Sequence, residues 1–426
     1  MYDKLKSANW WWVIVGLLSI PWLLYSSAAF YMRYVADDIC TLHQFQRIGI
    51  LNAIIYRYNG YLSKYAYSFF ELAATAGGTG FIAPSTLILF AIWLVCLSLM
   101  LYIVLQRLGY TAFLPQSIAG ALLITIALFG ALPSLDGTIY WQSALLGHTM
   151  AAILFTVWVL VVIIDPMPLA FSGLIAFTMA SCSETSAAFI VPMLMLLFIL
   201  PVGRKRNKLL IGSVFYFIGI LIFVVAPGNA HRAAGLYSQG TLYAVISTAR
   251  TLLPFVRQLV ITQPLVMLAL LVAPAIVAYT SENRFSAEFA ARMLLAAFFA
   301  ALIIISMCFF ISYYLAGEPL FDRAWVVPDY FTLLLVVIGS FCVGVLIKEK
   351  TIESPASSVQ RRWLLYGAAA LLMIASLASS GDALHQVAHM RTFAAEWDVR
   401  EAAHIEYPLP DMIAGENEID AICRAA

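Results

Sequence analysis

The chain has 426 residues, of which 63% are hydrophobic and only 11% are charged. Soluble domains carry about 25% charged residues, so this composition excludes a water-soluble protein and indicates a polytopic membrane protein. The formal net charge is +1, which offers no bulk attraction for nucleic acid. The six cysteines show neither CxxC nor metal-ligand spacing, and we expect them to be ordinary core residues.

Hydrophobic segments long enough to cross a bilayer, about 20 residues each, recur along the whole chain. Eleven spans are predicted, at 10–31, 81–105, 116–133, 146–164, 169–182, 185–201, 209–226, 264–280, 292–314, 328–347 and 362–380. The stretch 169–201 is interpreted as two short helices that meet at a polar break around Ser183 and Glu184. One long tilted helix is the alternative, and it would invert the topology downstream. The fold class is thus all-α, with a transmembrane domain at 1–380 and a short extracytoplasmic tail at 381–426.

The basic residues predict the orientation, because short cytoplasmic loops carry an excess of Lys and Arg. The cluster GRKRNK at 203–208 is the strongest such signal, and Lys4 and Lys6 precede the first span. We therefore expect a cytoplasmic N-terminus, a retained signal-anchor helix at 10–31, and the long loops outside.

The outer loop at 32–80 has apolar residues at helical spacing with Arg and Lys between them. This pattern predicts one or two amphipathic helices that lie in the membrane interface. A second interfacial stretch is expected at about 241–262.

Asp37 and Asp38 stand side by side at the start of that loop. Two neighbouring carboxylates in an apolar setting cannot both ionise at low cost, so one is suited to act as a general base. The plain alternative is a solvated helix end. We favour Asp37 as the base, because burial would raise its pKa.

Cations on the outer side suit an anionic phosphate, which Arg binds as a fork and Lys as a point charge. The phosphate-binding candidates are His231 and Arg232 in the turn APGNAHR, Arg323 in EPLFDR, and Arg57 and Lys64 in the first outer loop. Arg323 could instead pair with a neighbouring acid, and Arg57 and Lys64 could simply snorkel.

Aromatic rings beside amides and carboxylates suit sugars, which have an apolar face and polar edges. The candidates for binding sugar or acceptor are Asp136, Tyr140, Trp141, Gln142, His148, Glu184 and Asn229. An aromatic belt at the bilayer interface is the alternative for the tyrosine and tryptophan.

The signal anchor, the ADD acidic pair, YNGYLSKY, YWQS, SET and APGNAHR together resemble a bacterial, O-antigen-modifying-like branch of the GT-C integral-membrane glycosyltransferases. The resemblance implies a sugar donor linked to polyprenyl phosphate, a glycan or lipid-linked acceptor, and inversion at the anomeric carbon. It also implies an Asp general base and cations that hold the leaving phosphate. Together with the predicted orientation, it implies a multi-pass protein of the bacterial inner membrane whose active face is extracytoplasmic. A divalent cation such as Mg²⁺ or Mn²⁺ stays open as a cofactor, and no metal-ligand set is predicted.

Two other functions remain open. A transporter or flippase for lipid-linked sugars would show internal repeats and a midplane site, and no repeat stands out here. A polymerase of lipid-linked glycans would also use arginines on the outer side, so it is harder to distinguish from a glycosyltransferase.

Overall fold

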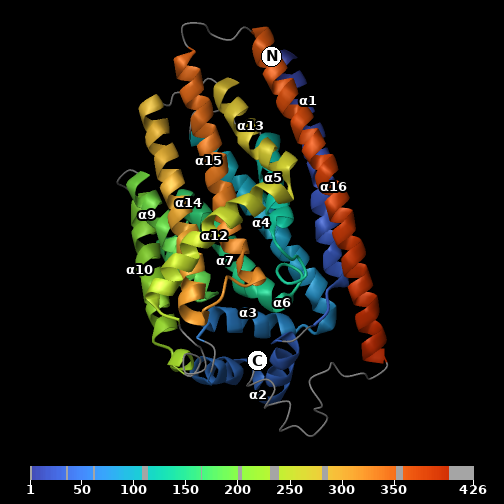
Figure 1. The fold of residues 1–426 in the computed structure, drawn as a ribbon, viewed down its shortest axis with the longest axis vertical. Helices are drawn as coiled ribbons and strands as arrows, with labels where there is room; N and C mark the ends of the chain where they lie inside the picture. Colours follow the sequence, from blue (N-terminus) through green and yellow to red (C-terminus); the bar gives the residue numbers. More distant parts are fainter. Residues whose placement is uncertain are drawn as a thin grey trace.

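The computed structural model describes residues 2–34, 37–60, 63–107, 114–164, 166–199, 204–230, 239–280, 286–351 and 358–402. Throughout these residues the chain is helical or irregular (Figure 1). The first half contains α1 (Tyr2–Ser27), η1 (Ala28–Tyr31), α2 (Asp37–Gly60), α3 (Tyr65–Thr75), η2 (Thr79–Phe81), α4 (Ile82–Arg107), α5 (Leu114–Ala131), α6 (Gln142–Ala144), η3 (Leu145–Thr149), α7 (Met150–Ile163), α8 (Leu169–Met179), η4 (Glu184–Phe189) and α9 (Ile190–Ile199). The second half contains α10 (Arg204–Val224), α12 (Thr241–Thr262), α13 (Pro264–Thr280), α14 (Ala287–Ala316), η5 (Asp322–Ala324), α15 (Val326–Lys350) and α16 (Ser358–Ala402).

Nine helical segments in the described part are long and apolar enough to cross a membrane. They are 10–31, 79–106, 114–131, 142–163, 205–224, 241–262, 287–316, 322–350 and 362–399. Eight of them overlap predicted spans, and the ninth, 241–262, is the stretch expected in the interface. The apolar helices at 169–179, 184–196 and 264–280 are shorter. The chain is therefore a multi-pass, all-helical membrane protein.

The stretch 169–201 contains the expected break. Helix α8 ends at Met179, and Ser183 has an extended backbone (φ −155°, ψ 165°) before the 3₁₀ helix η4 begins at Glu184. Ser183 and Ser186 form a reciprocal capping box, which satisfies backbone donors at the start of η4. The polar residues thus begin a second helix rather than continue the first.

Helices α2 and α3 lie across one end of the bundle, at the opposite end from the first residues of α1 (Figure 1). The expected helices in the first loop are present, and their position in a membrane interface stays a prediction. At this same end α16 finishes, because it continues as one helix through Ala402 (Figure 1). Residues 381–402 of the predicted tail therefore belong to a helix that runs on beyond the expected span.

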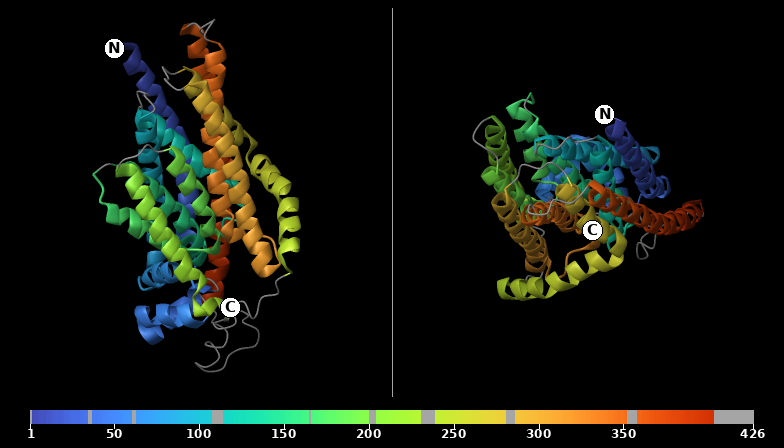
Figure 2. Two further views of the ribbon diagram at one scale, coloured as in Figure 1. Left: turned by 90° about the vertical axis from the view of Figure 1, so that its left-hand side faces the viewer. Right: turned by 90° about the horizontal axis from the view of Figure 1, so that it is seen from above.

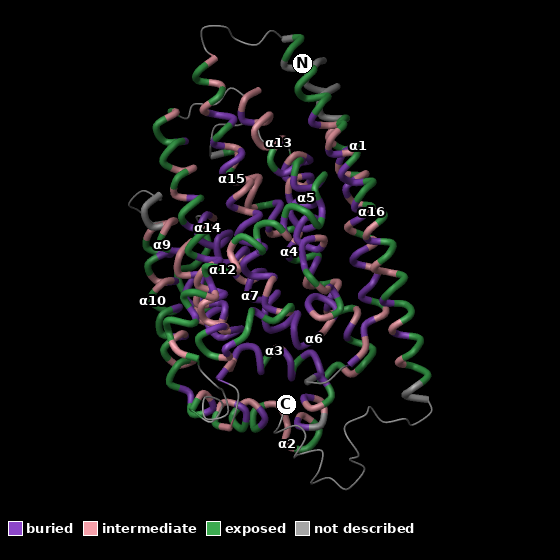
Figure 3. The backbone as a smooth tube through the Cα atoms, in the orientation of Figure 1, coloured by how far each residue is buried: buried purple, intermediate pink, exposed green. Residues whose placement is uncertain are grey.

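The core lies around α7. Of the 18 most apolar consecutive residues in the segment 142–163, 89% are buried, whereas the corresponding share in 79–106 is 22%. Buried positions follow α3, α6 and α7, whereas α10, α14 and α16 carry many exposed ones (Figure 3). Seen from above, α12 runs along the outside of the bundle at an angle to its neighbours (Figure 2).

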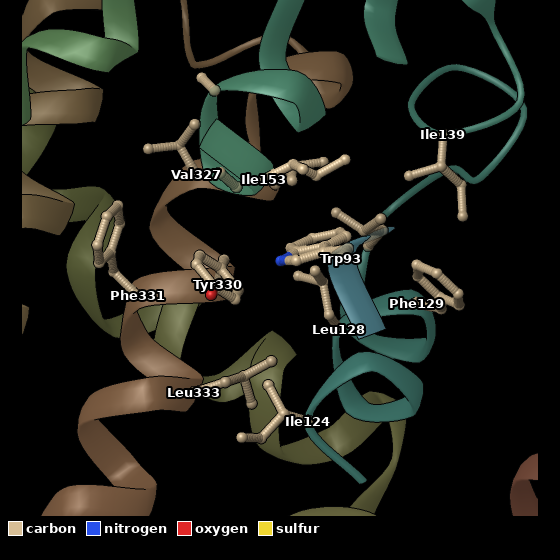
Figure 4. Packing of buried hydrophobic residues seen from close by; sticks show 14 of the residues in the cluster. Trp93, Ile124, Leu128, Phe129, Ile139, Ile153, Val327, Tyr330, Phe331 and Leu333 are labelled. Atoms are coloured by element: carbon tan, nitrogen blue, oxygen red, sulfur yellow. The ribbon is translucent and has the colours of Figure 1, made fainter. Parts of the chain in front are cut away.

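Aromatic packing joins α4, α7 and α15 in this core (Figure 4). The rings of Trp93 and Tyr330 have centroids 5.1 Å apart. Trp93 Nε1 donates to Thr156 Oγ1 at 3.2 Å, and the Thr156 hydroxyl lies 2.6 Å from the Tyr330 hydroxyl. The polar atoms of these buried residues are therefore satisfied by one another, as buried polar groups require.

Candidate functional site

A buried polar cluster joins α2, α3 and α6 at the end of the bundle where α2 and α3 lie. Its charged members are Asp38, Arg57 and Glu71, with exposed fractions of 0%, 3% and 1%. Such side chains are almost never fully buried unless they are paired. Here each one has partners within the cluster.

Arg57 uses all three nitrogens of its guanidinium group. Nε donates to Gln44 Oε1 at 2.7 Å, one Nη donates to Thr41 Oγ1 at 2.6 Å, and the other forms an ion pair with Glu71. The structure therefore places Arg57 inside the protein, bonded to side chains of α2 and α3.

A backbone turn at Gly49 makes these contacts geometrically feasible. In a straight helix, residues 41 and 57 would lie about 24 Å apart along the axis. Gly49 has φ 73° and ψ 168°, a left-handed conformation that favours glycine, and it divides α2 into two helical parts. The second part can then bring Arg57 back to Thr41 and Gln44.

Ser143 connects the two carboxylates. Its backbone N–H donates to Asp38 Oδ1 at 3.0 Å, and its hydroxyl contacts both Asp38 Oδ1 and Glu71 Oε1. The Tyr67 hydroxyl donates to the same Glu71 oxygen at 2.7 Å. Because a serine hydroxyl has one proton, it can donate to only one carboxylate at a time. Asp38 is thus a buried anchor between α2 and the segment that begins α6.

The residues before Ser143 form a second, adjoining group with Arg323. The Arg323 guanidinium carbon lies 5.3 Å from the centroid of the Trp141 ring and 5.4 Å from that of Phe321. Trp141 Nε1 and both amide atoms of Gln142 are buried, and no hydrogen bond reaches them from the described residues. A buried polar group left in this state costs about 1–3 kcal/mol, so a water or a ligand hydroxyl would be stabilised there.

The helix following Gln142 is unusual. The five residues of η3, which include His148, form a π-helical turn between α6 and α7. Such turns are rare and often occur at functional sites. His148 is buried within it, with an exposed fraction of 6%.

Lys64 and Glu184 form an ion pair of 2.7 Å on the flank of the cluster. The Lys64 ammonium also lies 5.9 Å from the centroid of the Tyr67 ring. This pair ties the chain before α3 to the break between α8 and η4, which gives both charges a partner in an apolar setting.

Two other predicted residues make local structural contacts. Tyr140 is buried and donates to the Tyr25 carbonyl at 2.6 Å. Asn229 donates to the carbonyls of Phe223 and Val224 at 2.6 and 3.2 Å, in the last turn of α10. These contacts tie down helix ends and do not bring either side chain to Ser143.

Asp136 accepts a hydrogen bond from Ser134 at 2.6 Å and lies 3.6 Å from His389 of α16. Burial alone would raise the pKa of Asp136. Hydrogen bonds from Ser134 and backbone N–H groups, together with the charge of His389, lower it below its usual value of 3.8 instead.

Some predicted residues lie outside the described part of the chain. They are His231 and Arg232. For Asp37, the first residue of α2, the backbone is described but the side chain is not.

Sequence reasoning missed Thr41, Gln44, Tyr67, Glu71 and Ser143. Only Glu71 gave a signal, as a lone acid within the apolar run YAYSFFELAAT of α3. Ser143 follows the aromatic loop directly but is an ordinary residue in sequence.

The cysteines also differ from expectation. Cys96, Cys182, Cys308 and Cys342 are free thiols, the last three buried as expected, but Cys40 of α2 is disulfide-bonded. The interpretation of all six as ordinary core residues is wrong for Cys40.

Among the described residues, no group of three or more His, Cys, Asp or Glu side chains is placed to hold a metal ion. In comparisons with known proteins, no family model, no curated protein and no solved structure matches this chain. What the fold itself establishes is a multi-pass, all-helical membrane protein.

Proposed function

We propose that the protein is a membrane glycosyltransferase that moves a sugar from a polyprenyl-phosphate donor to a glycan or lipid-linked acceptor. The reaction takes place on the extracytoplasmic face. One observation carries this proposal: three segments far apart in sequence meet at one end of the bundle. They are the acidic start of α2, the segment 141–143, and Arg323.

The Trp141–Gln142 segment supplies the groups that a sugar requires. An indole ring offers an apolar face to a pyranose, and the Gln142 amide has a donor and an acceptor that the described residues leave unbonded. Hydroxyl groups of a sugar would satisfy these atoms and remove the cost of leaving them buried.

Arg323 is suited to hold the phosphate of the donor. It is held beside Trp141 by the cation–π contact, and a guanidinium group can bind phosphate oxygens in pairs. Lys64 and Arg57 form ion pairs with Glu184 and Glu71. We assign the phosphate to Arg323 because of its place beside Trp141.

A groove on α12 offers a place for the lipid chain. It measures about 440 Å³ and is lined by Leu253, Pro254, Arg257, Gln258, Ile261 and Thr262. On the opposite, buried side of the same helix, Phe255 packs against Trp325, with ring centroids 5.5 Å apart. Trp325 follows Arg323 by two residues, so this contact connects α12 to the segment that carries the proposed phosphate site.

Asp37 is the residue to which we assign the general base. The neighbouring Asp38 is fully buried and bonded to Ser143, so it positions α2 instead. Asp37 takes the proton of the acceptor hydroxyl, and the acceptor oxygen forms a bond to the anomeric carbon. The bond from that carbon to the phosphate oxygen breaks, and polyprenyl phosphate leaves with the electron pair beside Arg323.

The test uses the full chain in lipid nanodiscs with a panel of polyprenyl-phosphate-linked hexoses and cell-envelope glycan acceptors. Release of polyprenyl phosphate is measured for the wild type, Asp37→Asn and Arg323→Gln. General-base catalysis contributes about 10²–10⁴-fold, so Asp37→Asn should lose at least about 100-fold in turnover with an unchanged melting temperature. Arg323→Gln should weaken the apparent affinity for the donor.

A matched control is Glu288→Gln, at an exposed acid on α14 that is paired with Arg292 in the next turn. It should keep full turnover. Wild-type protein that releases no polyprenyl phosphate from any donor, or Asp37→Asn with wild-type turnover, would refute the proposal.

A further inference from the structure

The last part of α16 contacts the segment that leads into α2. Arg33 donates from Nε to Asp398 Oδ1 and from Nη2 to Asp398 Oδ2, both at 2.7 Å. Two parallel bonds between a guanidinium group and a carboxylate are a strong geometry that also fixes their orientation. The two residues lie 365 positions apart in sequence, so this contact joins the last described helix to the start of the candidate site.

The segment 32–34, which carries Arg33, lies directly against the buried cluster. After η1 the backbone is extended at Met32 (φ −66°, ψ 146°). Met32 and Tyr34 are buried, whereas Arg33 between them is half-buried and reaches α16, in the alternation of an extended chain. Burial and the nearby charge of Asp38 raise the pKa of Tyr34 to about 12. Arg33 therefore holds a segment that is packed beside Asp38.

A second contact of α16 reaches the other half of the candidate site. His389 lies 3.6 Å from Asp136, in the loop between α5 and α6 whose last residue is Trp141. This loop is braced internally, because the Tyr140 N–H donates to the Leu135 carbonyl at 2.9 Å. One helix thus contacts both segments that form the candidate site.

The same helix is fastened inside the bundle just before these contacts. The Ser376 hydroxyl donates to the Leu17 carbonyl of α1 at 2.7 Å. Asp382 accepts hydrogen bonds from the Tyr25 hydroxyl and from Gln263 Nε2, the latter at 3.3 Å. These bonds fix the position of α16 before it reaches the end of the bundle where α2 lies (Figure 1).

We propose that the part of α16 after Asp382 is a support that sets the position of α2 relative to Trp141, with Asp398 as its positioning residue. Asp398 acts through Arg33 and does not itself touch a substrate. The kinetic consequence rests on the proposed function: movement of Arg33 would displace Asp37, which follows it by four residues, from the acceptor hydroxyl. A displacement of about 1 Å is enough to slow such a step.

A double-mutant cycle tests the contact. Release of polyprenyl phosphate is measured with the full chain in lipid nanodiscs for the wild type, Arg33→Gln, Asp398→Asn and the combined variant. Each single variant should lower turnover about fivefold, which corresponds to the upper end for an exposed ion pair. The apparent affinity for the donor should stay unchanged, because its phosphate is assigned to Arg323. The combined variant should lose no more than either single one, since both substitutions remove the same contact.

Hydrogen exchange follows the position of α2 without any turnover. Amides 41–48, in the first part of α2, should exchange about fivefold faster in either single variant. Arg33→Asp combined with Asp398→Arg keeps the pair with reversed charges and should restore both turnover and exchange. The matched control is Glu396→Gln, at an exposed acid two residues before Asp398 that forms no ion pair with the described residues, and it should change neither.

Turnover and exchange at wild-type values in both single variants would overturn the proposal. So would losses that multiply in the combined variant, or a reversed pair that restores neither property. If the wild type released no polyprenyl phosphate, the proposed function would fail. The exchange of amides 41–48 alone would then decide whether Asp398 positions α2.

Discussion

Replacing Arg57 by methionine tests whether the buried cluster holds α2 and α3 together. Arg57 is 3% exposed and donates to Gln44, Thr41 and Glu71. The substitution leaves the Glu71 carboxylate buried without its cation and removes the donor to two side-chain oxygens. Breaking a buried ion pair from one side costs about 3–5 kcal/mol, so we expect the free energy of unfolding to fall by about that amount.

A second variant separates the lost charge pair from lost packing. Arg57→Met combined with Glu71→Gln removes the unpaired charge, while the amide can still accept hydrogen bonds from Tyr67 and Ser143. The double variant should recover about 2 kcal/mol relative to the single one, because the two residues are directly coupled. The control Arg391→Met changes an exposed arginine of α16 and should stay within about 0.5 kcal/mol of the wild type.

The assay is reversible unfolding in mixed micelles, followed by tryptophan fluorescence for all four proteins. If Arg57→Met lost less than about 1 kcal/mol, the pair would not carry the stability assigned to it. A double variant no more stable than the single one would show that packing, not charge, explains the loss.

Two further predictions concern contacts outside this cluster. Lys208 is fully buried, and its ammonium donates to the carbonyls of Val161, at 3.2 Å, and of Ile164 at the end of α7. Lys208→Met should therefore destabilise the protein by about 1–3 kcal/mol in thermal melting. The control Lys350→Met, at an exposed lysine in the last turn of α15, should not. The lowered pKa of Asp136 means that its contribution to stability is complete above the ordinary value of 3.8 and is lost as the pH falls through the lowered value. Hydrogen exchange of residues 382–399 should therefore speed up on acidification below about pH 4, and Asp136→Asn should remove this pH dependence.

Periodicity and composition predicted the helical class, most of the long spans, the break near Ser183 and the helices across one end of the bundle. These features depend on local sequence. By contrast, α12 has the lowest mean hydropathy of the nine long helices, 1.3, and its charged face suggested an interfacial position. Composition alone does not separate a sparsely buried span from a surface helix.

The cluster could not be predicted, because its contacts depend on chain reversal and on distant partners. From the sequence alone, Arg57 resembles an interfacial residue whose charge reaches water. Only the turn at Gly49 brings it back to Thr41 and Gln44. Ser143 lies 105 residues from Asp38 and 72 from Glu71, a separation that single-sequence patterns do not report.

The Gly49 turn also has a consequence for biogenesis. The contacts of Arg57 with Thr41, Gln44 and Glu71 span only 13 to 16 residues, so they can form once the chain has emerged to about residue 75. The bond from Ser143 to Asp38 must await two further spans. We therefore expect the charges to be neutralised in an early hairpin, before α7 inserts and seals them. A residue that cannot adopt a positive φ at position 49 would leave Arg57 and Glu71 unpaired in the nascent chain at the membrane, where quality-control proteases act.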